Sequence, residues 1–287
     1  MGGLGNQMFQ YALGRRISLL RNTDVKADVS FLNDTRFNHT HRKFELDILS
    51  AEISIATNAE LNKFSNIQVS KLKRGIQKVL PFVFPNHTIG ETVKQYDVEI
   101  LNAPKNSLFI GYWQTEKYFL PIQDTIRKDF TFKMPLEGLN KTLAESISSC
   151  NSVSMHIRRG DYVHNSETSK FHGVCSPEYY YEALEFIKKK SANIQLYIFS
   201  DDMEWVKVNM KFDVPVTYVG NNIDNQSYVD MQLMSLCKHN IIANSSFSWW
   251  GAWLNNNPEK IVIAPSKWFN DSSINATDII PEGWQKI

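Results

Sequence analysis

The chain has 287 residues, enough for one large or two medium-sized domains with a buried core. Its 31 lysines and arginines against 30 acidic residues give a formal net charge of +1, which excludes a broadly basic surface of the kind that coats nucleic acid. Hydrophobic residues make up 43% and charged residues 21%, as in soluble globular proteins. The cysteines Cys150, Cys175 and Cys237 lie far apart without metal-ligand spacing, and this pattern predicts reduced thiols.

Targeting signals are not recognisable in the sequence. No run of about 18 apolar residues predicts a membrane span, and no basic stretch followed by an apolar core predicts a secretory signal. Several Asn-x-Ser/Thr sequons occur, and one begins at Asn244, where a glycan would block the ligand site inferred below. We therefore expect a cytoplasmic protein, with peripheral attachment at the inner membrane left open.

The amino-terminal half begins with a glycine-rich turn over residues 2–7 that leads into an amphipathic helical pattern. Such a turn presents backbone N–H groups and the positive end of a helix dipole to an anion, although many only solve a backbone problem. A strand is predicted over 24–28, and residues 50–105 carry no clear pattern. A second strand, over 108–112, precedes a helix that is expected to run to Phe130.

Strands and helices alternate in the carboxyl-terminal half. Strands are predicted over 152–157, 194–199, 216–219, 240–243 and 260–264, and helices over 177–190, 227–237 and 245–256. This alternation predicts a parallel sheet covered on both faces, a Rossmann-like domain that binds ligands at the carboxyl ends of its strands. The change in regularity predicts two domains, 1–140 and 141–287.

Two adjacent arginines, Arg158 and Arg159, follow the strand that ends at Ile157. A guanidinium group binds phosphate bidentately and keeps its charge at physiological pH. At the carboxyl end of a parallel strand, the pair predicts a phosphate site. The alternative is a surface loop with an ion pair between Arg159 and Asp161.

Small hydroxylic residues follow the strand over 240–243 and precede three tryptophans. Ser245 and Ser246 are expected to cap a helix, and the free N–H groups of its first turn predict a second anion site on the same sheet edge. Capping alone is the alternative. Asp230, in the preceding helix, has a carboxylate suited to the paired N–H donors of guanine, but from sequence alone a solvated surface aspartate is favoured.

Two further segments allow competing interpretations. Asp201 and Asp202 end another strand, where paired carboxylates suit Mg²⁺ or Mn²⁺. A helix cap by Ser200 or Asp201 is favoured instead, because the arginines already supply positive charge, and we expect no metal and no cofactor. Residues 111–119 mix aromatic and polar side chains as sugar-binding clefts do, although packing in the core is favoured for most of these aromatics.

Taken together, segments 2–10, 111–119, 156–162, 199–202, 244–254 and 281–284 resemble the galactoside 2-alpha-L-fucosyltransferases of glycosyltransferase family 11. The motif over 156–159 is also similar to that of alpha-1,6- and protein O-fucosyltransferases. The resemblance implies a GT-B-like α/β fold, in which two Rossmann-like domains face a cleft and the carboxyl-terminal domain holds the nucleotide sugar. Family members usually have a strand before the glycine motif, and this sequence starts at the motif.

The resemblance also implies a reaction and a set of site residues. It implies inverting, metal-independent transfer of L-fucose from GDP-fucose to the 2-hydroxyl of a terminal β-galactoside on an oligosaccharide or glycolipid. Arg158 would contact the β-phosphate, His156 would lie beside the nucleotide, and Asp230 would read the guanine. The remaining implied residues are Gly5, Asn6, Gln7, Asn244, Ser245 and Ser246 for the donor, Trp113 and Gln114 for the acceptor, and Asp161 or Glu167 as general base, with a base-free reaction left open.

Two alternatives to this function remain at the level of the sequence. One is a fucosyltransferase of another linkage or acceptor sugar, and the other is a GDP-sugar- or glycan-binding protein without catalysis. A purine NTPase is disfavoured, because the sequence has no GxxxxGK[ST] motif.

Overall fold

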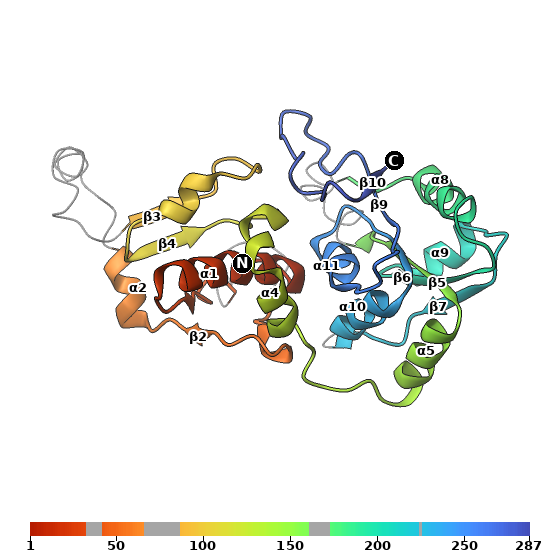
Figure 1. Cartoon of the computed structure of the whole chain (residues 1–287), viewed down its shortest axis with the longest axis horizontal. Helices are drawn as coiled ribbons and strands as arrows, with labels where there is room; N and C mark the ends of the chain where they lie inside the picture. Colours follow the sequence, from red (N-terminus) through yellow and green to blue (C-terminus); the bar gives the residue numbers. More distant parts are fainter. Residues whose placement is uncertain (33–41, 66–86, 161–172, 224–225) are drawn as a thin grey trace. The chain divides into compact units, whose positions relative to one another are not determined.

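A computed structural model describes residues 1–32, 42–65, 87–160, 173–223 and 226–287. The chain divides into two compact units, unit 1 (Met1–Thr131) and unit 2 (Phe132–Ile287), shown in Figure 1. The boundary predicted after residue 140 falls inside helix α5 (Gly138–Ser149), whereas the units divide before that helix begins. None of the helices in the described ranges is long and apolar enough to span a membrane.

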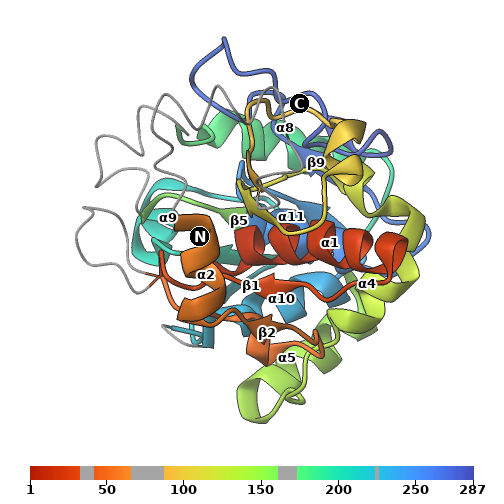
Figure 2. The same ribbon diagram turned by 90° about the vertical axis from the view of Figure 1, so that its left-hand side faces the viewer.

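Unit 1 is built on helix α1 (Leu4–Arg21), which buries an apolar face that includes Met8, Phe9 and Leu13. This helix lies between two separate pairs of parallel strands, β1–β2 and β3–β4 (Figures 1 and 2). The regular elements after α1 are β1 (Lys26–Ala27), β2 (Ser54–Ile55), α2 (Asn58–Ser65), β3 (His87–Gly90), β4 (Ser107–Ile110) and α4 (Gln123–Asp129). Single 3-10 turns cover Leu46–Ile48, Val98–Asn102, Glu116–Tyr118 and Leu120–Ile122.

The elements predicted for unit 1 are present but shorter than expected. The strand expected over 24–28 has two residues, and the one expected over 108–112 ends at Ile110. The helix expected to reach Phe130 is wrong in its first part, where two 3-10 turns precede α4. Pro121 stands at the start of the second turn, where its missing N–H is tolerated, but it could not continue a helix from upstream.

Unit 2 contains one six-stranded sheet, in which all strands are parallel and the order is β10-β9-β8-β5-β6-β7. The strands are β5 (Asn151–Ile157), β6 (Ile194–Ser200), β7 (Val216–Val219), β8 (His239–Ile241), β9 (Val262–Ala264) and β10 (Gln285–Lys286). The helices besides α5 are α8 (Pro177–Lys188), α9 (Met203–Asn209), α10 (Ser227–Leu236) and α11 (Ser246–Leu254). The chain moves outward from β5 to β7 and then returns to β8, so the strand order reverses between β5 and β8. This is the Rossmann order, and ligands bind at such a reversal.

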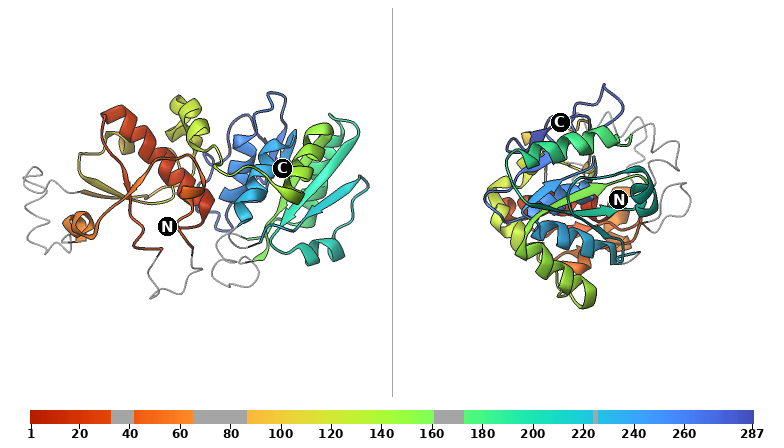
Figure 3. Two further views of the ribbon diagram at one scale, coloured as in Figure 1. Left: turned by 90° about the horizontal axis from the view of Figure 1, so that it is seen from below. Right: turned by 90° about the vertical axis from the view of Figure 1, so that its right-hand side faces the viewer.

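The two faces of the central strand β5 have opposite chemistry. Its odd-numbered residues, 153, 155 and 157, join an apolar core with α8 and α9. Its even-numbered residues are polar and buried, on the face covered by α5, α10 and α11 (Figures 1 and 3). There Ser154 accepts a 2.7 Å hydrogen bond from the amide of Asn240, and the hydroxyls of Tyr197 and Ser146 lie 2.7 Å apart. The polar face therefore leads to the end of β5 at which the arginines stand.

The prediction of an α/β protein with a parallel sheet is confirmed. Every strand and helix predicted in this half forms, and each boundary agrees within two residues with the observed one. The helix after Asp202, α9, was expected only through its cap, and the edge strand β10 was not predicted. Both are short, and β10 is held by pairing with β9 rather than by a pattern of its own.

Candidate functional site

Arg158 directly follows β5, at the point where the strand order reverses. Its Nη1 lies 2.9 Å from Oδ2 of Asp201, and the two side chains are 21% and 23% exposed. Oδ1 of Asp201 accepts the N–H of Arg159 at 2.8 Å. A Cβ on Gly160 would come within 2.5 Å of Asp201 Oδ2, so only glycine leaves room for this carboxylate. Asp201 therefore packs into the turn after β5 and holds the guanidinium of Arg158 at the strand end.

Arg159 has different surroundings from its neighbour. Its guanidinium carbon lies 3.4 Å from the ring centroid of Trp205, and its Nε lies 3.3 Å from Oδ2 of Asp202. Asp202 also caps α9 by accepting the N–H of Trp205. The favoured cap by Ser200 or Asp201 is therefore wrong, because Asp201 is engaged by the turn after β5. The alternative partner of Arg159, Asp161, lies outside the described residues.

His156 connects the end of β5 with the first turn of α11. Its side chain is 5% exposed, its ring centroid lies 5.7 Å from that of Phe247, and its Nδ1 has no hydrogen-bond partner among the described residues. Burial lowers the pKa of His156 to about 4, while Asp201 opposes this shift and Arg158 adds to it. The imidazole is therefore neutral at physiological pH, with a polar atom left for a ligand beside Arg158.

The start of α11 is capped by a hydroxyl and carries no acidic residue in its first turn. Ser245 is the N-cap, as predicted, and its Oγ accepts the N–H of Phe247 at 3.3 Å. Trp249 and Trp250 are fully buried, and Nε1 of Trp249 donates to the carbonyl of Ile279 at 2.7 Å. The positive end of this helix is thus firmly anchored and is not neutralised by a carboxylate of its own turn.

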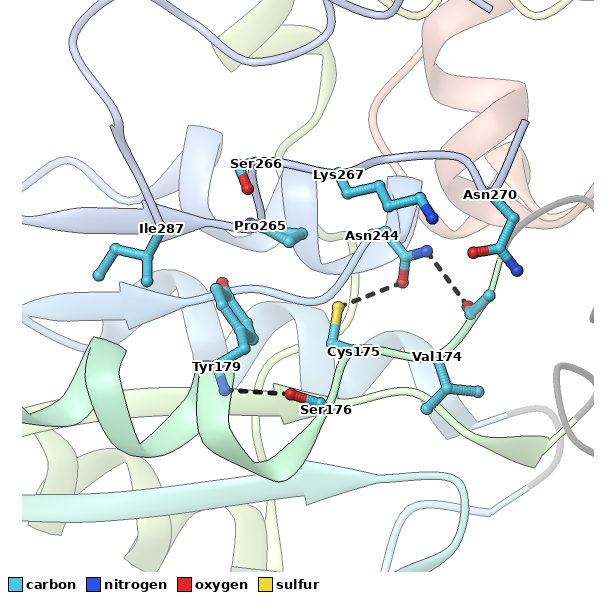
Figure 4. A pocket seen from close by; sticks show the side chains of 11 residues that line it. Val174, Cys175, Ser176, Tyr179, Asn244, Pro265, Ser266, Lys267, Asn270 and Ile287 are labelled. Carbon is cyan, nitrogen blue, oxygen red and sulfur yellow. Dashed lines mark hydrogen bonds between the residues drawn. The ribbon is translucent and has the colours of Figure 1, made fainter. Parts of the chain in front are cut away.

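Asn244, predicted at the donor site, joins neighbouring segments through its amide. Nδ2 donates to the carbonyls of Gly173 and Trp268, and Oδ1 accepts from the thiol of Cys175. The same side chain lines an open pocket of about 210 Å³ beside the first turn of α8, together with Tyr179 (Figure 4). Arg158, Asp230, Ser245 and Ser246 do not line this pocket. Asn244 therefore ties the segment before α11 to the segments that carry Gly173 and Trp268.

Asp230 lies in α10, which packs on both α11 and α5. Its side chain is partly buried, and Oδ1 accepts a 2.7 Å hydrogen bond from the amide of Asn222. Burial raises the pKa of Asp230 to about 7, and the bond from Asn222 opposes that rise. A surface aspartate surrounded by water would show no such shift, so the structure disfavours the solvated alternative.

The glycine-rich turn of unit 1 opens α1, but a carboxylate of the chain already occupies this helix start. Glu45 accepts the N–H of Leu4, and burial raises its pKa, while Arg42 and the Leu4 N–H oppose the rise. Gly5 is buried in the same turn. The amide of Gln7 bonds the carbonyls of Gly2 and Lys43 and the N–H of Glu45, at 2.8 to 2.9 Å. Gln7 therefore ties the segment that carries Glu45 to the helix start.

The three other predicted residues of unit 1 lie close together. Oδ1 of Asn6 accepts a 2.7 Å hydrogen bond from Nε2 of Gln114, which is 8% exposed. Trp113 is 4% exposed and packs edge-on against Phe109 and Tyr118. Packing in the core is therefore the observed role of its ring.

The backbone of Trp113 is unusual, with a φ of +57° that bulky residues rarely adopt. The carboxylate of Glu91 accepts the N–H groups of Tyr112 and Trp113 at 3.0 and 2.9 Å. This carboxylate stabilises the bend that places Gln114 against Asn6.

The predicted residues thus form two separate groups, one in each unit. In unit 2, His156, Arg158, Ser245 and Ser246 surround the β5–β8 reversal, and Asp230 stands on the adjoining helix. Asp161 and Glu167 lie outside the described residues. The sequence analysis missed the roles of Asp201, first interpreted as a cap, and of Asn222. The available signal was an acidic side chain directly after β6 and an amide side chain shortly after β7. Within the described ranges, no cluster of three or more His, Cys, Asp or Glu side chains forms a metal-binding arrangement.

Comparison with known proteins places this chain among sugar transferases. An alpha-1,2-colitosyltransferase of Escherichia coli is 40% identical over 297 aligned residues, a match that covers 100% of this chain and 96% of that protein. The O-antigen biosynthesis glycosyltransferase WbnK of Escherichia coli is 34% identical, with 99% and 97% covered. Galactoside alpha-(1,2)-fucosyltransferase 2 of Mus musculus is 26% identical, with 51% of this chain and 44% of the mouse protein covered.

The model of the family described as glycosyl transferase family 11 matches residues 1–287. Two relatives above 30% identity match over nearly their whole length. The chain therefore belongs to glycosyl transferase family 11.

Proposed function

We propose that this glycosyltransferase moves L-fucose from GDP-fucose to the 2-hydroxyl of a terminal β-galactoside, with inversion and without a metal ion. The observation that carries the proposal is the contact between His156 and Phe247, 5.7 Å between ring centroids, which joins the strand end bearing Arg158 to the start of α11. A guanidinium and a helix start with no acidic residue in its own first turn, both at a Rossmann strand reversal, suit a nucleoside diphosphate. The name of the mouse relative supports the linkage and the acceptor.

In the proposed reaction, the bond between fucose C1 and the β-phosphate oxygen breaks while acceptor O2 bonds C1 from the opposite face. The acceptor hydroxyl loses its proton, and negative charge develops on the departing GDP. Arg158 and the first turn of α11, beginning at Ser246, would stabilise that charge without reorganising. Asp161 and Glu167 stay the candidates for the base that accepts the proton, because both follow Arg158 closely in sequence.

The contrast between the two helix starts supports placing the diphosphate in unit 2. Glu45 occupies the start of α1, so a phosphate there would meet a carboxylate at close range. Gly5 and Gln7 would then shape the turn that presents Asn6, with Gln114 beside it, to the sugars. Trp113 would support Gln114 from the core rather than contact the acceptor with its ring.

A second candidate differs in the donor sugar. The relative with 40% identity is named for colitose, which is fucose without the 3-hydroxyl. A site that hydrogen-bonds a hydroxyl rejects the deoxy analogue strongly, whereas an apolar pocket discriminates only weakly against an added hydroxyl. Direct competition between the two donors therefore distinguishes the two candidates.

The test is to incubate the protein with lactose and either GDP-fucose or GDP-colitose in EDTA, following GDP release and the product linkage by NMR. A 2'-fucosylated product in EDTA, with a higher kcat/KM for GDP-fucose, is the expected result. Preferential turnover of GDP-colitose would replace the donor, and loss of activity in EDTA would refute metal independence. Binding of GDP without turnover over a panel of galactosides and other acceptor sugars would favour the non-catalytic alternative.

A further inference from the structure

A cluster of three asparagines lies next to Asp230 in unit 2. Asn140 comes from the first turn of α5, while Asn221 and Asn222 stand in the loop between β7 and α10. Asn140 and Asn222 form a reciprocal amide pair, with N···O distances of 2.8 and 3.1 Å. Nδ2 of Asn221 lies 2.9 Å from Oδ1 of Asn140 and 3.1 Å from Oδ1 of Asn222. The amides therefore link α5 to the loop that precedes α10.

Asn222 has no hydrogen-bonding capacity left for a ligand. Its Nδ2 donates to Asp230 and Asn140, and its Oδ1 accepts from Asn140 and Asn221. A primary amide offers two N–H donors and two acceptor lone pairs, and all four are used. Its side chain is also 7% exposed. Asn222 can therefore act on a ligand only through the side chains that it bonds, and Asp230 is the charged one among them.

Only one of the two carboxylate oxygens of Asp230 accepts a hydrogen bond from the described residues. Oδ1 accepts the 2.7 Å bond from Asn222, whereas Oδ2 accepts no hydrogen bond from the described part of the chain. This bond holds one carboxylate oxygen and restricts the orientations that the group can adopt. A carboxylate held in this way can accept two parallel N–H donors, and the Watson–Crick edge of guanine supplies such a pair from N1 and N2.

We propose that Asn222, braced by Asn140, is a positioning residue that aims the Asp230 carboxylate at the N1–H and N2–H donors of the guanine base and thereby sets the selectivity for a guanine nucleotide. The proposal rests on the proposed function, because it presupposes a GDP-sugar donor. Inosine diphosphate lacks the 2-amino group and retains N1–H, so the ratio of the affinities for GDP and IDP measures the pairing geometry. A general loss of stability would weaken the binding of both nucleotides equally.

Asn221 provides the matched control. It adjoins Asn222 in sequence and bonds the same amide network, but it is exposed, and its amide donates to Asn140 and Asn222 rather than to Asp230. If the network acted only by stabilising the loop, Asn221→Ala and Asn222→Ala would have similar effects on nucleotide binding.

The experiment measures GDP and IDP binding by calorimetry, and kcat and KM for the donor, on the intact protein and on Asn222→Ala, Asn140→Ala, Asn221→Ala and Asp230→Asn. We expect about a 10-fold preference for GDP over IDP in the unmodified protein, since a hydrogen bond to a charged group is at stake. Asn222→Ala and Asp230→Asn should reduce this preference to about 2-fold or less and raise KM more than they lower kcat. Asn140→Ala should have an intermediate effect, and Asn221→Ala should leave the preference unchanged.

The outcomes separate this inference from the function on which it rests. A preserved GDP preference in Asn222→Ala, together with its loss in Asp230→Asn, would overturn the positioning role while leaving the donor assignment intact. A protein that binds no GDP at all would overturn both. If Asn222→Ala unfolds, Asn222→Ser and the intermediate Asn140→Ala variant decide the matter through the same GDP/IDP ratio.

Discussion

The two helix starts that the sequence motifs indicated as anion sites, those of α1 and α11, differ in the groups that lie against the positive end of the helix dipole. The start of α1 receives the carboxylate of Glu45 from a distant segment, and Gln7 holds that segment in place. The start of α11 is capped by the hydroxyl of Ser245 and has no acidic residue in its own first turn, and Arg158 stands at the neighbouring strand end. A helix start is therefore a candidate anion site only where the fold does not supply its own anion. This difference favours unit 2 for the proposed diphosphate site and a structural role for the glycine turn.

Replacing Arg158 should cause the largest change. The substitution Arg158→Lys keeps the positive charge but loses the planar guanidinium group that binds phosphate bidentately. We therefore expect kcat for fucose transfer to fall at least about 100-fold, which corresponds to roughly 3 kcal/mol of transition-state stabilisation. Steady-state kinetics of GDP release measure this effect. Arg159→Lys is the control, because Arg159 is held by Trp205 and Asp202, and it should lower kcat only a few-fold. Equal losses in both variants would contradict the distinction between the two arginines.

Adding a carboxylate to the α11 start should make it resemble the α1 start. Ser246→Glu should weaken GDP binding roughly 10- to 100-fold through repulsion of the phosphates, while a carboxylate near a helix start stabilises by about 0.3–1 kcal/mol. Calorimetry and thermal unfolding measure the two effects separately. The variant Ser246→Gln introduces a neutral side chain of the same size as glutamate, and its GDP affinity should stay within a few-fold of that of the original protein. A Ser246→Glu variant with unchanged GDP affinity would exclude this helix start as the phosphate site.

The pH dependence of GDP binding should sharpen the same assignment, because α10, which carries Asp230, packs on α11. Burial raises the pKa of Asp230 to about 7, and only its ionised form can accept both guanine N–H groups. GDP affinity should therefore fall about tenfold per pH unit below about 7 and level off above it. Measurements of GDP affinity between about pH 5.5 and 8.5 test this expectation. The control is Asp230→Asn, which should bind GDP weakly and show no decrease of affinity below about pH 7. An unchanged acid limb in that variant would assign the titration to another group.

Removing the carboxylate at the α1 start should have the smallest effect. Glu45→Gln should leave GDP affinity within about 2-fold and change the free energy of unfolding by less than about 1 kcal/mol. Because burial raises the pKa of Glu45 above 4.5, the original protein loses stability as pH rises from 4.5 through that higher value. The variant lacks this loss, so its stability relative to the original should increase with pH, as denaturant unfolding at pH 4 and 7 would reveal. A marked gain in GDP affinity would instead make α1 a second phosphate site.

The sequence predicted unit 2 better than unit 1 for a physical reason. Buried parallel strands such as β6 contain continuous apolar runs and are followed or preceded by helices with clear caps, as Ser176 and Ser245 show for α8 and α11. The strands of unit 1 have two to four residues and depend on tertiary pairing, which leaves little local pattern. Arg158 could be found because it directly follows a strand, and Ser245 because a hydroxylic residue stands between a strand and a helical pattern. Asp201 and Glu45 could not be assigned, since their partners lie some 40 residues away along the chain.

The tryptophans that anchor α11 provide an intrinsic fluorescence signal for unit 2. Trp249, Trp250 and Trp253 lie within one helix, and the ring of Trp284 lies 5.3 Å from that of Trp249. Four of the seven indoles in the chain thus gather directly behind the proposed phosphate site, whereas Trp113 is the single indole encoded in unit 1. Intrinsic fluorescence should therefore respond to nucleotide arrival at α11, and a Trp113→Phe variant would make the unfolding of unit 2 visible alone.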